Sequence, residues 1–194
     1  MRRDASKMLT IVLVAMLALS QQRLSAATVT IGGPFTLVAP GGTTVSDATY
    51  RGKWLLVFFG YTFCPNVCPI TLLEIAVALQ QLGPAASELQ PLFISIDPDR
   101  DTPDVMAAYT QSFDSRIVGL TGTAAQIASV AKEYGAYYDP HRTGPGPDDY
   151  VMDHGTYLYL MDPNGKFVRG FDADTPGTMI ADKLREMMAA LIKD

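Results

Sequence analysis

The feature that most constrains the fold is a continuous apolar run, Lys53-Trp-Leu-Leu-Val-Phe-Phe-Gly60. A strand with one solvated face alternates apolar and polar residues, and this run does not alternate. It therefore predicts a strand that is buried on both faces, with a layer of structure on each side of its sheet. A second run of this kind, Leu92-Phe-Ile-Ser-Ile96, predicts a second buried strand.

Helical patterns lie between and after these runs. An apolar stripe predicts a helix over residues 71–82, which Gly83-Pro84 ends. Residues 103–113 and 123–134 each follow or begin with a threonine that can cap a helix, and residues 177–192 form a C-terminal amphipathic segment. Four helices are therefore expected in the chain.

Two further pairs of short strands are marked by their turns. Phe35–Val38 and Thr43–Val45 surround a Pro-Gly-Gly turn and predict an N-terminal β-hairpin. Residues 157–161 and 166–171 flank Asp162-Pro-Asn-Gly165, which is a strong hairpin signal.

This order of elements predicts an α/β protein with a central mixed sheet flanked by helices. It is the order of a thioredoxin-like fold to which an N-terminal β-hairpin has been added. The stretch 139–149 is rich in proline and glycine and is expected to be a long loop.

Residues 1–27 have the pattern of a targeting segment. Basic residues precede the apolar run Met8–Leu19, and Ser25-Ala-Ala27 supplies small residues for cleavage. The run is shorter than the ~20 residues of a membrane-spanning helix. We therefore expect a signal peptide over residues 1–27, with an uncleaved N-terminal membrane anchor as the alternative, and one domain over residues 28–194. Export predicts the bacterial periplasm, free or anchored to the inner membrane.

The formal net charge of −5 excludes one class of partner. The leader carries four basic residues and one acidic residue, so the remaining domain is more acidic than the whole chain. Nucleic acid requires a basic face, and none is expected here. An acidic surface favours a basic partner surface.

Cys64 and Cys68 are the only cysteines, and both follow the first buried strand. A disulfide that closes so short a loop would stabilise the fold little. Pro69 fits a helix only within the first turn, so the helix begins no earlier than about Asn66. Both sulfurs then lie at a helix N-terminus, which favours thiolates. Two thiolates select copper(I) or zinc rather than calcium or magnesium.

A third ligand is expected from histidine, of which the chain has two. His154 precedes the strand 157–161, whose entry lies across from the cysteine loop in a thioredoxin-like topology. The predicted metal ligands are therefore Cys64, Cys68 and His154, whereas His141 is expected on the surface. Asp153 would either orient the imidazole of His154 or cap a turn.

A charged loop follows the second buried strand and contains Asp97, Asp99, Arg100 and Asp101. Two interpretations stay open. The loop either docks a partner or supports the metal site, or it is an ion-paired entry to a helix that Thr102 caps.

The chain resembles the SCO/SenC family of copper-binding assembly factors for cytochrome c oxidase. The matching motifs cover nearly the whole chain after the leader: Gly60-Tyr-Thr-Phe-Cys-Pro-Asn-Val-Cys-Pro69, Asp97-Pro-Asp-Arg-Asp-Thr-Pro103, Gly119-Leu-Thr-Gly122, Asp153-His154 and Tyr159-Leu-Met-Asp-Pro-Asn-Gly-Lys-Phe167. The resemblance implies a thioredoxin-like fold in which Cys64, Cys68 and His154 bind one copper ion, as Cu(I) or Cu(II).

The resemblance also implies the partners. The copper would be delivered to the dinuclear copper centre of oxidase subunit II, beside a membrane. Other copper chaperones or thioredoxin-like reductases would be further partners. The chain departs from the family pattern at Asn66, where members usually carry an acidic residue, and at Gly155, where they usually carry Ser or Thr. Neither position is a ligand.

Two enzymatic functions compete with copper delivery. In a thiol–disulfide oxidoreductase, Cys64 and Cys68 would be a catalytic dithiol that keeps the client's copper-site cysteines reduced. Redox catalysts of this fold usually space their cysteines by two residues, however, and do not require His154. A peroxidase of this fold carries a threonine three residues before its reactive cysteine, where this chain has Tyr61. The sequence therefore favours a metallochaperone over an enzyme.

Overall fold

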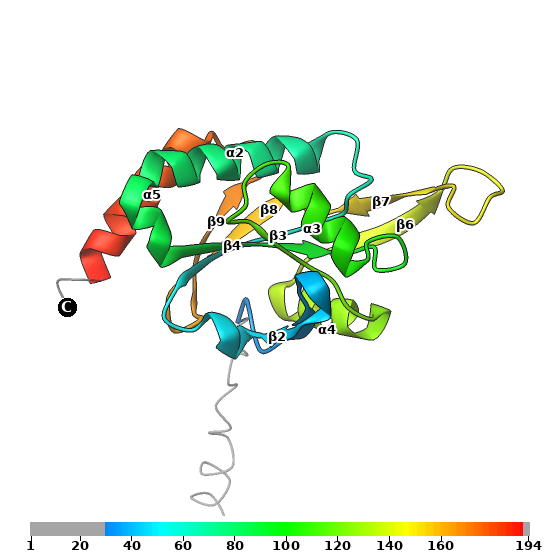
Figure 1. Ribbon diagram of the computed structural model, residues 1–194, viewed down its shortest axis with the longest axis horizontal. Coiled ribbons are helices and arrows are strands. Elements are labelled where there is room, and N and C mark those ends of the chain that lie inside the picture. Colours follow the sequence, from blue (N-terminus) through cyan, green and yellow to red (C-terminus); the bar gives the residue numbers. More distant parts are fainter. Residues whose placement is uncertain (1–29, 192–194) are drawn as a thin grey trace, which may run out of the picture.

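The computed structural model describes residues 30–191 and is built on a five-stranded mixed sheet (Figure 1). The strand order is β5-β4-β3-β8-β9. These strands are β3 (Trp54–Gly60), β4 (Leu89–Ser95), β5 (Val118–Leu120), β8 (Tyr157–Met161) and β9 (Phe167–Asp172). Two separate hairpins pair β1 (Thr36–Val38) with β2 (Thr44–Ser46), and β6 (Tyr138–Arg142) with β7 (Tyr150–His154).

The helices are α2 (Val67–Leu82), α3 (Pro103–Gln111), α4 (Ala124–Tyr134) and α5 (Gly177–Leu191). Short 3-10 turns occupy Pro40–Gly42, Asp47–Tyr50 and Gly83–Glu88. The Thr102 and Thr123 side chains accept hydrogen bonds from the first turns of α3 and α4, which confirms both predicted caps. Each cap satisfies a backbone N–H that has no partner within its helix.

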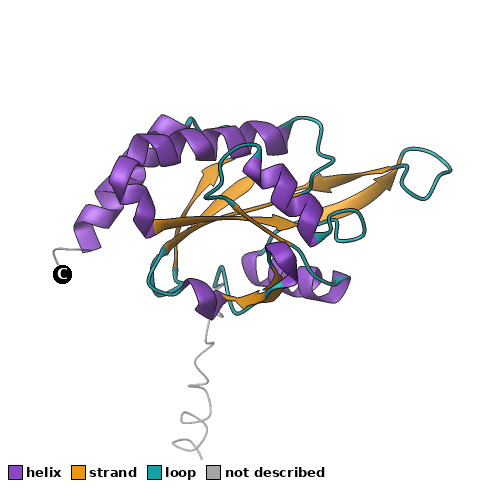
Figure 2. Ribbon diagram, in the orientation of Figure 1, coloured by secondary structure: helices purple, strands orange, loops and turns teal. Residues whose placement is uncertain are grey.

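The pairing of the central strands determines where the functional loops lie. β3 pairs in parallel with β4 in a register that runs from Trp54 opposite Leu89 to Gly60 opposite Ser95. Because the strands are parallel and end together, the loops that follow Gly60 and Ser95 leave the same edge of the sheet. β8 runs antiparallel to β3, so its first residues lie at this edge too. Figure 2 shows the strands, helices and connecting loops in one view.

Both faces of the sheet are covered, as the continuous apolar run over residues 53–60 predicts. Trp54, Leu56 and Phe58 pack with residues of α2 and α5 in one core cluster. Leu55, Val57 and Phe59 pack with the β1–β2 hairpin and α4 in the other. Figure 1 shows α2 and α5 above the sheet and β2 and α4 below it. The expected mixed sheet with an added N-terminal hairpin is therefore confirmed.

Within residues 30–191, one helical stretch, Val67–Glu88, is long and apolar enough to cross a membrane. Its apolar residues have a partner in the fold, because Leu72, Ile75 and Leu79 are fully buried against the sheet and α5. The predicted signal peptide lies outside the described residues.

Two local expectations need correction, and one strand was not expected. The helix expected over 71–82 begins at Val67, because its first turn carries the cysteine motif rather than an apolar stripe. The stretch 139–149, expected to be a long loop, contains most of β6, and only residues 143–149 connect it to β7. Backbone pairing with β7 makes Asp139–Arg142 a strand although its residues are polar or proline. β5 is a three-residue strand whose pattern is too short to be recognised.

Candidate metal centre

The cysteine loop lies where β3 passes into α2. Cys64 is in the loop and is half-buried, whereas Cys68 is the second residue of α2 and is fully buried. Asn66 is the residue before the helix, as the position of Pro69 predicts, and its side chain makes no capping hydrogen bond. Instead, the backbone N–H of Cys68 donates to Cys64 Sγ at 3.4 Å. The sulfur therefore satisfies a helix N–H that has no partner within the helix.

Gly60 makes room for the buried sulfur. A Cβ atom at this position would lie 2.5 Å from Cys68 Sγ and 2.7 Å from the ring of Phe93. Real Cβ atoms do not approach other atoms so closely, so a larger residue would displace the sulfur or the ring. The last residue of β3 is thus a glycine because the Cys68 side chain packs directly on its backbone.

His154 is the last residue of β7 and faces both sulfurs. Its Nε2 atom lies 3.8 Å from Cys64 Sγ and 3.7 Å from Cys68 Sγ. Its Nδ1 atom lies 3.0 Å from the carbonyl oxygen of Gly155, which can only accept, so Nδ1 carries the proton in this contact. The lone pair of Nε2 is then directed to the sulfurs, as a metal ligand requires.

Aromatic rings fix the plane of this imidazole. The Tyr61 ring meets it edge-on, with centroids 5.9 Å apart and an interplanar angle of 88°, and Phe58 is tilted against it at 6.2 Å. The Tyr61 hydroxyl also accepts a hydrogen bond from the backbone N–H of Met152 at 3.2 Å. Tyr61 therefore holds both the ring of His154 and the strand that carries it.

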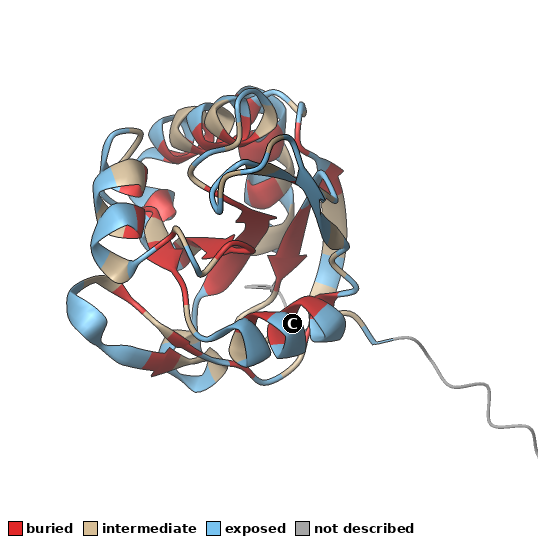
Figure 3. Cartoon of the chain, turned by 90° about the vertical axis from the view of Figure 1, so that its right-hand side faces the viewer, coloured by how far each residue is buried: buried red, intermediate tan, exposed pale blue. Residues whose placement is uncertain are grey.

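The three predicted ligands converge on one point. The Sγ atoms of Cys64 and Cys68 and a ring nitrogen of His154 all lie within 4.8 Å of one another. Both cysteines are free thiols, with no disulfide between them. Figure 3 views the molecule from the end at which the β6–β7 hairpin projects and α2 begins. Two sulfurs and one imidazole are soft ligands that suit copper and zinc.

The two thiols hold their protons very differently. The pKa of Cys64 is lowered to about 3, chiefly by the hydrogen bond from the Cys68 thiol. Burial of Cys64 opposes this shift, and the contact with His154 adds to it. The same hydrogen bond to Cys64, together with burial, raises the pKa of Cys68. The pair therefore holds one proton between two sulfurs, and Cys64 is the thiolate.

A buried carboxylate anchors the cysteine loop to the sheet. Asp101 is fully buried and accepts hydrogen bonds from Thr62 Oγ1 at 2.5 Å, from the Thr62 N–H at 3.2 Å and from Ser95 Oγ at 2.7 Å. Burial raises the pKa of Asp101, and these donors lower it. Thr62 is two residues before Cys64, so this contact fixes the loop at its first ligand.

Arg100 ties the same loop to the hairpin that carries His154. Its Nε donates to Asp97 at 2.6 Å, and its Nη1 donates to the Tyr150 carbonyl oxygen at 3.1 Å. Its guanidinium also lies over the rings of Tyr150, at 3.7 Å, and Phe63, at 4.7 Å. The Tyr150 hydroxyl donates to Asp97 at 2.6 Å. We refer to Asp97, Arg100, Tyr150 and Phe63 as the Arg100 cluster.

These contacts show how the charged loop is held. The loop is an ion-paired helix entry that Thr102 caps, and it also supports the site through Arg100 and Asp101. Sequence reasoning did not identify Gly60, Tyr61 and Thr62 as supporting residues. Their position at the end of the buried strand beside Cys64 is the signal that could have found them.

Asp153 does not orient His154. Its carboxylate lies 2.9 Å from Nε2 of His141, on the exposed side of the hairpin, because neighbouring residues of a strand point to opposite faces. The backbone carbonyl of Gly155 takes the role expected of Asp153. His141 is half exposed, in line with its predicted surface position, and lies away from the sulfurs on β6.

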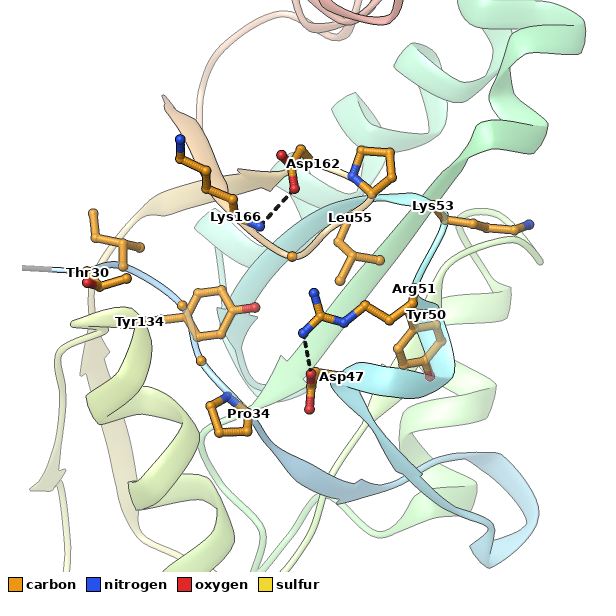
Figure 4. A pocket seen from close by; sticks show the side chains of 15 residues that line it. Thr30, Pro34, Asp47, Tyr50, Arg51, Lys53, Leu55, Tyr134, Asp162 and Lys166 are labelled. Carbon is orange, nitrogen blue, oxygen red and sulfur yellow. Dashed lines mark hydrogen bonds and ion pairs between the residues drawn. The ribbon is translucent and has the colours of Figure 1, made fainter. Parts of the chain in front are cut away.

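A cavity of about 290 Å³ lies at the other end of β3 (Figure 4). Its walls include Asp47, Arg51, Tyr134 and Asp162. Arg51 is paired with Asp47 at 2.8 Å, and Asp162 accepts the backbone N–H of Lys166 at 2.9 Å. The cavity holds none of the predicted metal ligands.

Comparison with known protein families matches residues 24–189 to the SCO1/SenC family. SenC of Rhodobacter capsulatus is 41% identical over 165 residues, which are 85% of this chain and 74% of SenC. The mitochondrial SCO2 homolog of Bos taurus is 40% identical over 162 residues, which are 81% of this chain. The match spans 60% of the length of the bovine protein and 47% of the human SCO1 homolog.

Solved structures show the same architecture. Copper-bound ScoI of Bradyrhizobium japonicum superposes with a TM-score of 0.75 at 44% identity, over 80% of this chain and 98% of ScoI. Yeast Sco1 with copper bound gives a TM-score of 0.76 at 34% identity, over 82% of this chain and 89% of Sco1. The fold is therefore that of the Sco proteins.

Proposed function

This chain belongs to the SCO1/SenC family, and we propose that it is a copper metallochaperone. It binds one copper ion, as Cu(I) or Cu(II), and delivers it to the dinuclear copper centre of cytochrome c oxidase subunit II during oxidase assembly. The observation that carries this proposal is the convergence of Cys64, Cys68 and His154 within 4.8 Å. The copper-bound relatives support the choice of metal.

The donor set fits copper in both oxidation states. Thiolates select Cu(I), and imidazole also suits Cu(II). Cys64 supplies a thiolate before any metal arrives, and binding displaces the proton that Cys68 retains. Copper is the cargo here. Because Cys64 is only partly buried, an acceptor can reach the copper from its side of the site.

Copper titration of the reduced protein tests this proposal. We expect one tightly bound copper per chain. His154→Ala should lower copper affinity by at least ~100-fold, because loss of a residue that merely supports a ligand already costs up to ~100-fold. Cys64→Ser and Cys68→Ser should abolish tight binding. A double cysteine variant that still binds one copper per chain would contradict the proposed ligands.

A second candidate function is thiol–disulfide exchange. The observation in its favour is a free cysteine pair in which one thiol has a strongly lowered pKa. The Cys64 thiolate would attack a client disulfide, forming a mixed disulfide and releasing one client thiol. Cys68 would then attack the mixed disulfide and release the second client thiol, as Cys64 and Cys68 become a disulfide. His154→Ala separates the two functions, because exchange should proceed without the imidazole while copper binding should not.

The cellular location is part of the proposal. SenC is bacterial, and one solved relative is a SCO1/SenC family lipoprotein of Bacillus anthracis, at 25% identity. We propose an exported protein of the bacterial periplasm that acts beside the inner membrane, with residues 1–27 as its signal peptide or anchor. Other copper chaperones and thioredoxin-like reductases are proposed as further partners. Mass spectrometry of the protein purified from periplasm and membrane fractions would show whether residues 1–27 are retained.

A further inference from the structure

A groove beside the metal centre has the chemistry of a docking site. It is about 430 Å³ in volume and is lined by Val67, Ile70, Thr71, Thr156 and Asp172–Asp174. Val67 directly precedes Cys68, and Thr156 lies two residues after His154. The lining of the groove therefore includes close sequence neighbours of two of the three proposed ligands.

The groove has a rigid floor. Thr71 is fully buried, and its hydroxyl lies 2.9 Å from the Val67 carbonyl oxygen and 3.1 Å from that of Ala173. The backbone N–H of Ala173 donates to the Thr156 carbonyl oxygen at 2.9 Å. The first turn of α2 and the segments that follow β7 and β9 are thereby held together, so the groove is part of the fold.

One wall of the groove is apolar and exposed. Ile70 lines the groove and is 54% exposed, and Leu73, which lies outside the lining, is 56% exposed. They are three residues apart on α2, so they lie on the same side of the helix. Phe63, in the cysteine loop, is 59% exposed. Large apolar side chains that gather around a functional site indicate a contact surface for another protein.

The opposite wall is acidic. Asp172 and Asp174 are exposed, and within residues 30–191 neither carboxylate has an ion pair or a side-chain hydrogen bond. No lysine or arginine lines the groove. Two carboxylates with no local counter-charge, facing an apolar wall, suit a segment that carries a basic residue next to an apolar one.

We infer that this groove docks a segment of the copper acceptor that presents a lysine or arginine beside an apolar side chain. The inference rests on the proposed function and names the surface that the delivery step uses. The acceptor's cysteines must come within bonding distance of copper, and Cys68 is fully buried. A segment seated in the groove brings the acceptor alongside Cys64 and His154, on the accessible side of the site.

The test compares copper transfer by wild type and by Asp172→Asn/Asp174→Asn. The asparagines keep the shape of both side chains and remove their charge. The probe is the reduced, copper-free soluble domain of oxidase subunit II, and copper arrival is followed by absorbance. We expect the variant to bind copper with unchanged affinity but to transfer it ~5–10-fold more slowly at low ionic strength, because charges at the rim of an interface act mainly on the association rate. The difference should fall below ~2-fold at about 1 M salt, where the Debye length is ~3 Å.

A matched control removes the same charge elsewhere. Glu88→Gln/Glu133→Gln changes two exposed carboxylates at the other end of the sheet, just before β4 and near the end of α4. It should transfer copper at the wild-type rate. Ile70→Ser tests the apolar wall and should also slow copper transfer. Its transfer rate should stay below that of wild type at high salt, because salt screens charges and does not replace an apolar contact.

The outcomes separate the inference from the proposed function. If wild type delivers copper and the Asp172/Asp174 variant delivers it equally fast, the groove is not the docking site although the function stands. If wild type binds no copper, the proposed function fails. The groove is then tested by calorimetry: equal affinities of wild type and the Asp172/Asp174 variant for the acceptor domain would overturn the groove as well. A wild-type dimer that Ile70→Ser dissociates would assign the groove to a second copy of the chain and overturn the inference.

Discussion

At the two cysteines, the same side chain meets two environments. Cys64 is half-buried and receives hydrogen bonds from the Cys68 thiol and the Cys68 backbone N–H, so its thiolate is stabilised. Cys68 is packed beneath Gly60 and Phe93, where burial disfavours a second negative charge. The pair thus offers one reactive sulfur and one that becomes a ligand only when a metal replaces its proton.

This difference predicts the pH dependence of alkylation. Since the pKa of Cys64 is lowered to about 3, the thiolate persists as pH falls, and iodoacetamide should modify Cys64 at nearly constant rate between about pH 8 and 5. A free cysteine, with a pKa of ~8.5, loses about tenfold in rate per pH unit over this range. Mass spectrometry of the alkylated peptide measures the rate.

The control is Cys68→Ala, which removes the thiol that donates to Cys64. Its Cys64 should need a higher pH to react, since the largest cause of the lowered pKa is gone. A wild-type rate that already falls tenfold per unit below pH 8 would contradict the assignment of Cys64 as the thiolate.

The Asp101 carboxylate gives a second prediction about single residues. Thr62→Val removes the 2.5 Å hydrogen bond on the side of the cysteine loop, and Ser95→Ala removes the 2.7 Å bond on the side of β4. Each should lower the free energy of unfolding by ~1–3 kcal/mol, the cost of leaving a buried acceptor short of a donor. Thr62→Val should also weaken copper binding, by ~10-fold for a similar free-energy change acting at the ligand loop, and by more than Ser95→Ala, in which the hydroxyl that accepts the Asp97 N–H is also lost.

Chemical denaturation and copper titration of both variants check this. Equal loss of copper affinity in Thr62→Val and Ser95→Ala would mean that Asp101 supports general stability and does not position Cys64.

Among the elements, the β6–β7 hairpin is attached to the rest of the molecule along β7, from Tyr150 to His154. Four of the five β6 residues are exposed, and Met152 is the buried residue of β7. The Arg100 cluster and the contact between Tyr61 and Met152 connect it to the cysteine loop. His154 ends the hairpin, so its position depends on these contacts.

A double-mutant cycle tests this coupling. Arg100→Gln removes the charge and the stacking on Tyr150 and Phe63, and it should weaken copper binding by ~10-fold, since neighbours that share a network couple by ~0.5–3 kcal/mol. In the His154→Ala background the same substitution should change copper affinity by less than ~2-fold, because Arg100 acts through His154. Calorimetric titration of the four proteins gives the coupling.

Arg116→Gln is the matched control, since Arg116 forms an exposed ion pair with Asp114 on another part of the surface. It should leave copper affinity unchanged. Equal losses from Arg100→Gln with and without His154 would show that Arg100 does not act through the imidazole.

For the whole molecule, ligand binding and stability are linked. The proposed ligands come from the cysteine loop with α2 and from β7, and they meet only in the folded chain. Copper therefore binds the native state in preference to the unfolded one. At a free copper concentration of ~100 times Kd, binding adds ~2.7 kcal/mol to stability.

We expect copper at this free concentration to raise the Tm of the reduced protein by ~5–10 °C, given ~2–4 °C per kcal/mol for a chain of this size. Oxidation of Cys64 and Cys68 to a disulfide should remove the shift, because copper needs both thiolates. Calorimetric scans of the reduced and oxidised proteins measure it. An equal shift in the oxidised protein would contradict the thiolate site.

Much of this molecule follows from local sequence patterns. The apolar run 53–60 determined that β3 is buried on both faces, because a strand with no polar side has no face to present to water. Pro69 determined where α2 can begin, because proline lacks the N–H that later turns require. The spacing of Cys64 and Cys68 at this helix end marked the site itself.

Tertiary structure decided what depends on partners distant in sequence. Asp139–Arg142 form a strand only because β7 supplies their hydrogen bonds, and no local pattern marks them. Asp153 turns away from His154 because alternation along β7 sends it to the exposed face. The contacts of Asp101 with Thr62 and of Arg100 with Tyr150 join residues 39 and 50 positions apart. The sequence by itself therefore determined the layers and pointed to the proposed ligands, and packing determined which residues hold those side chains in place.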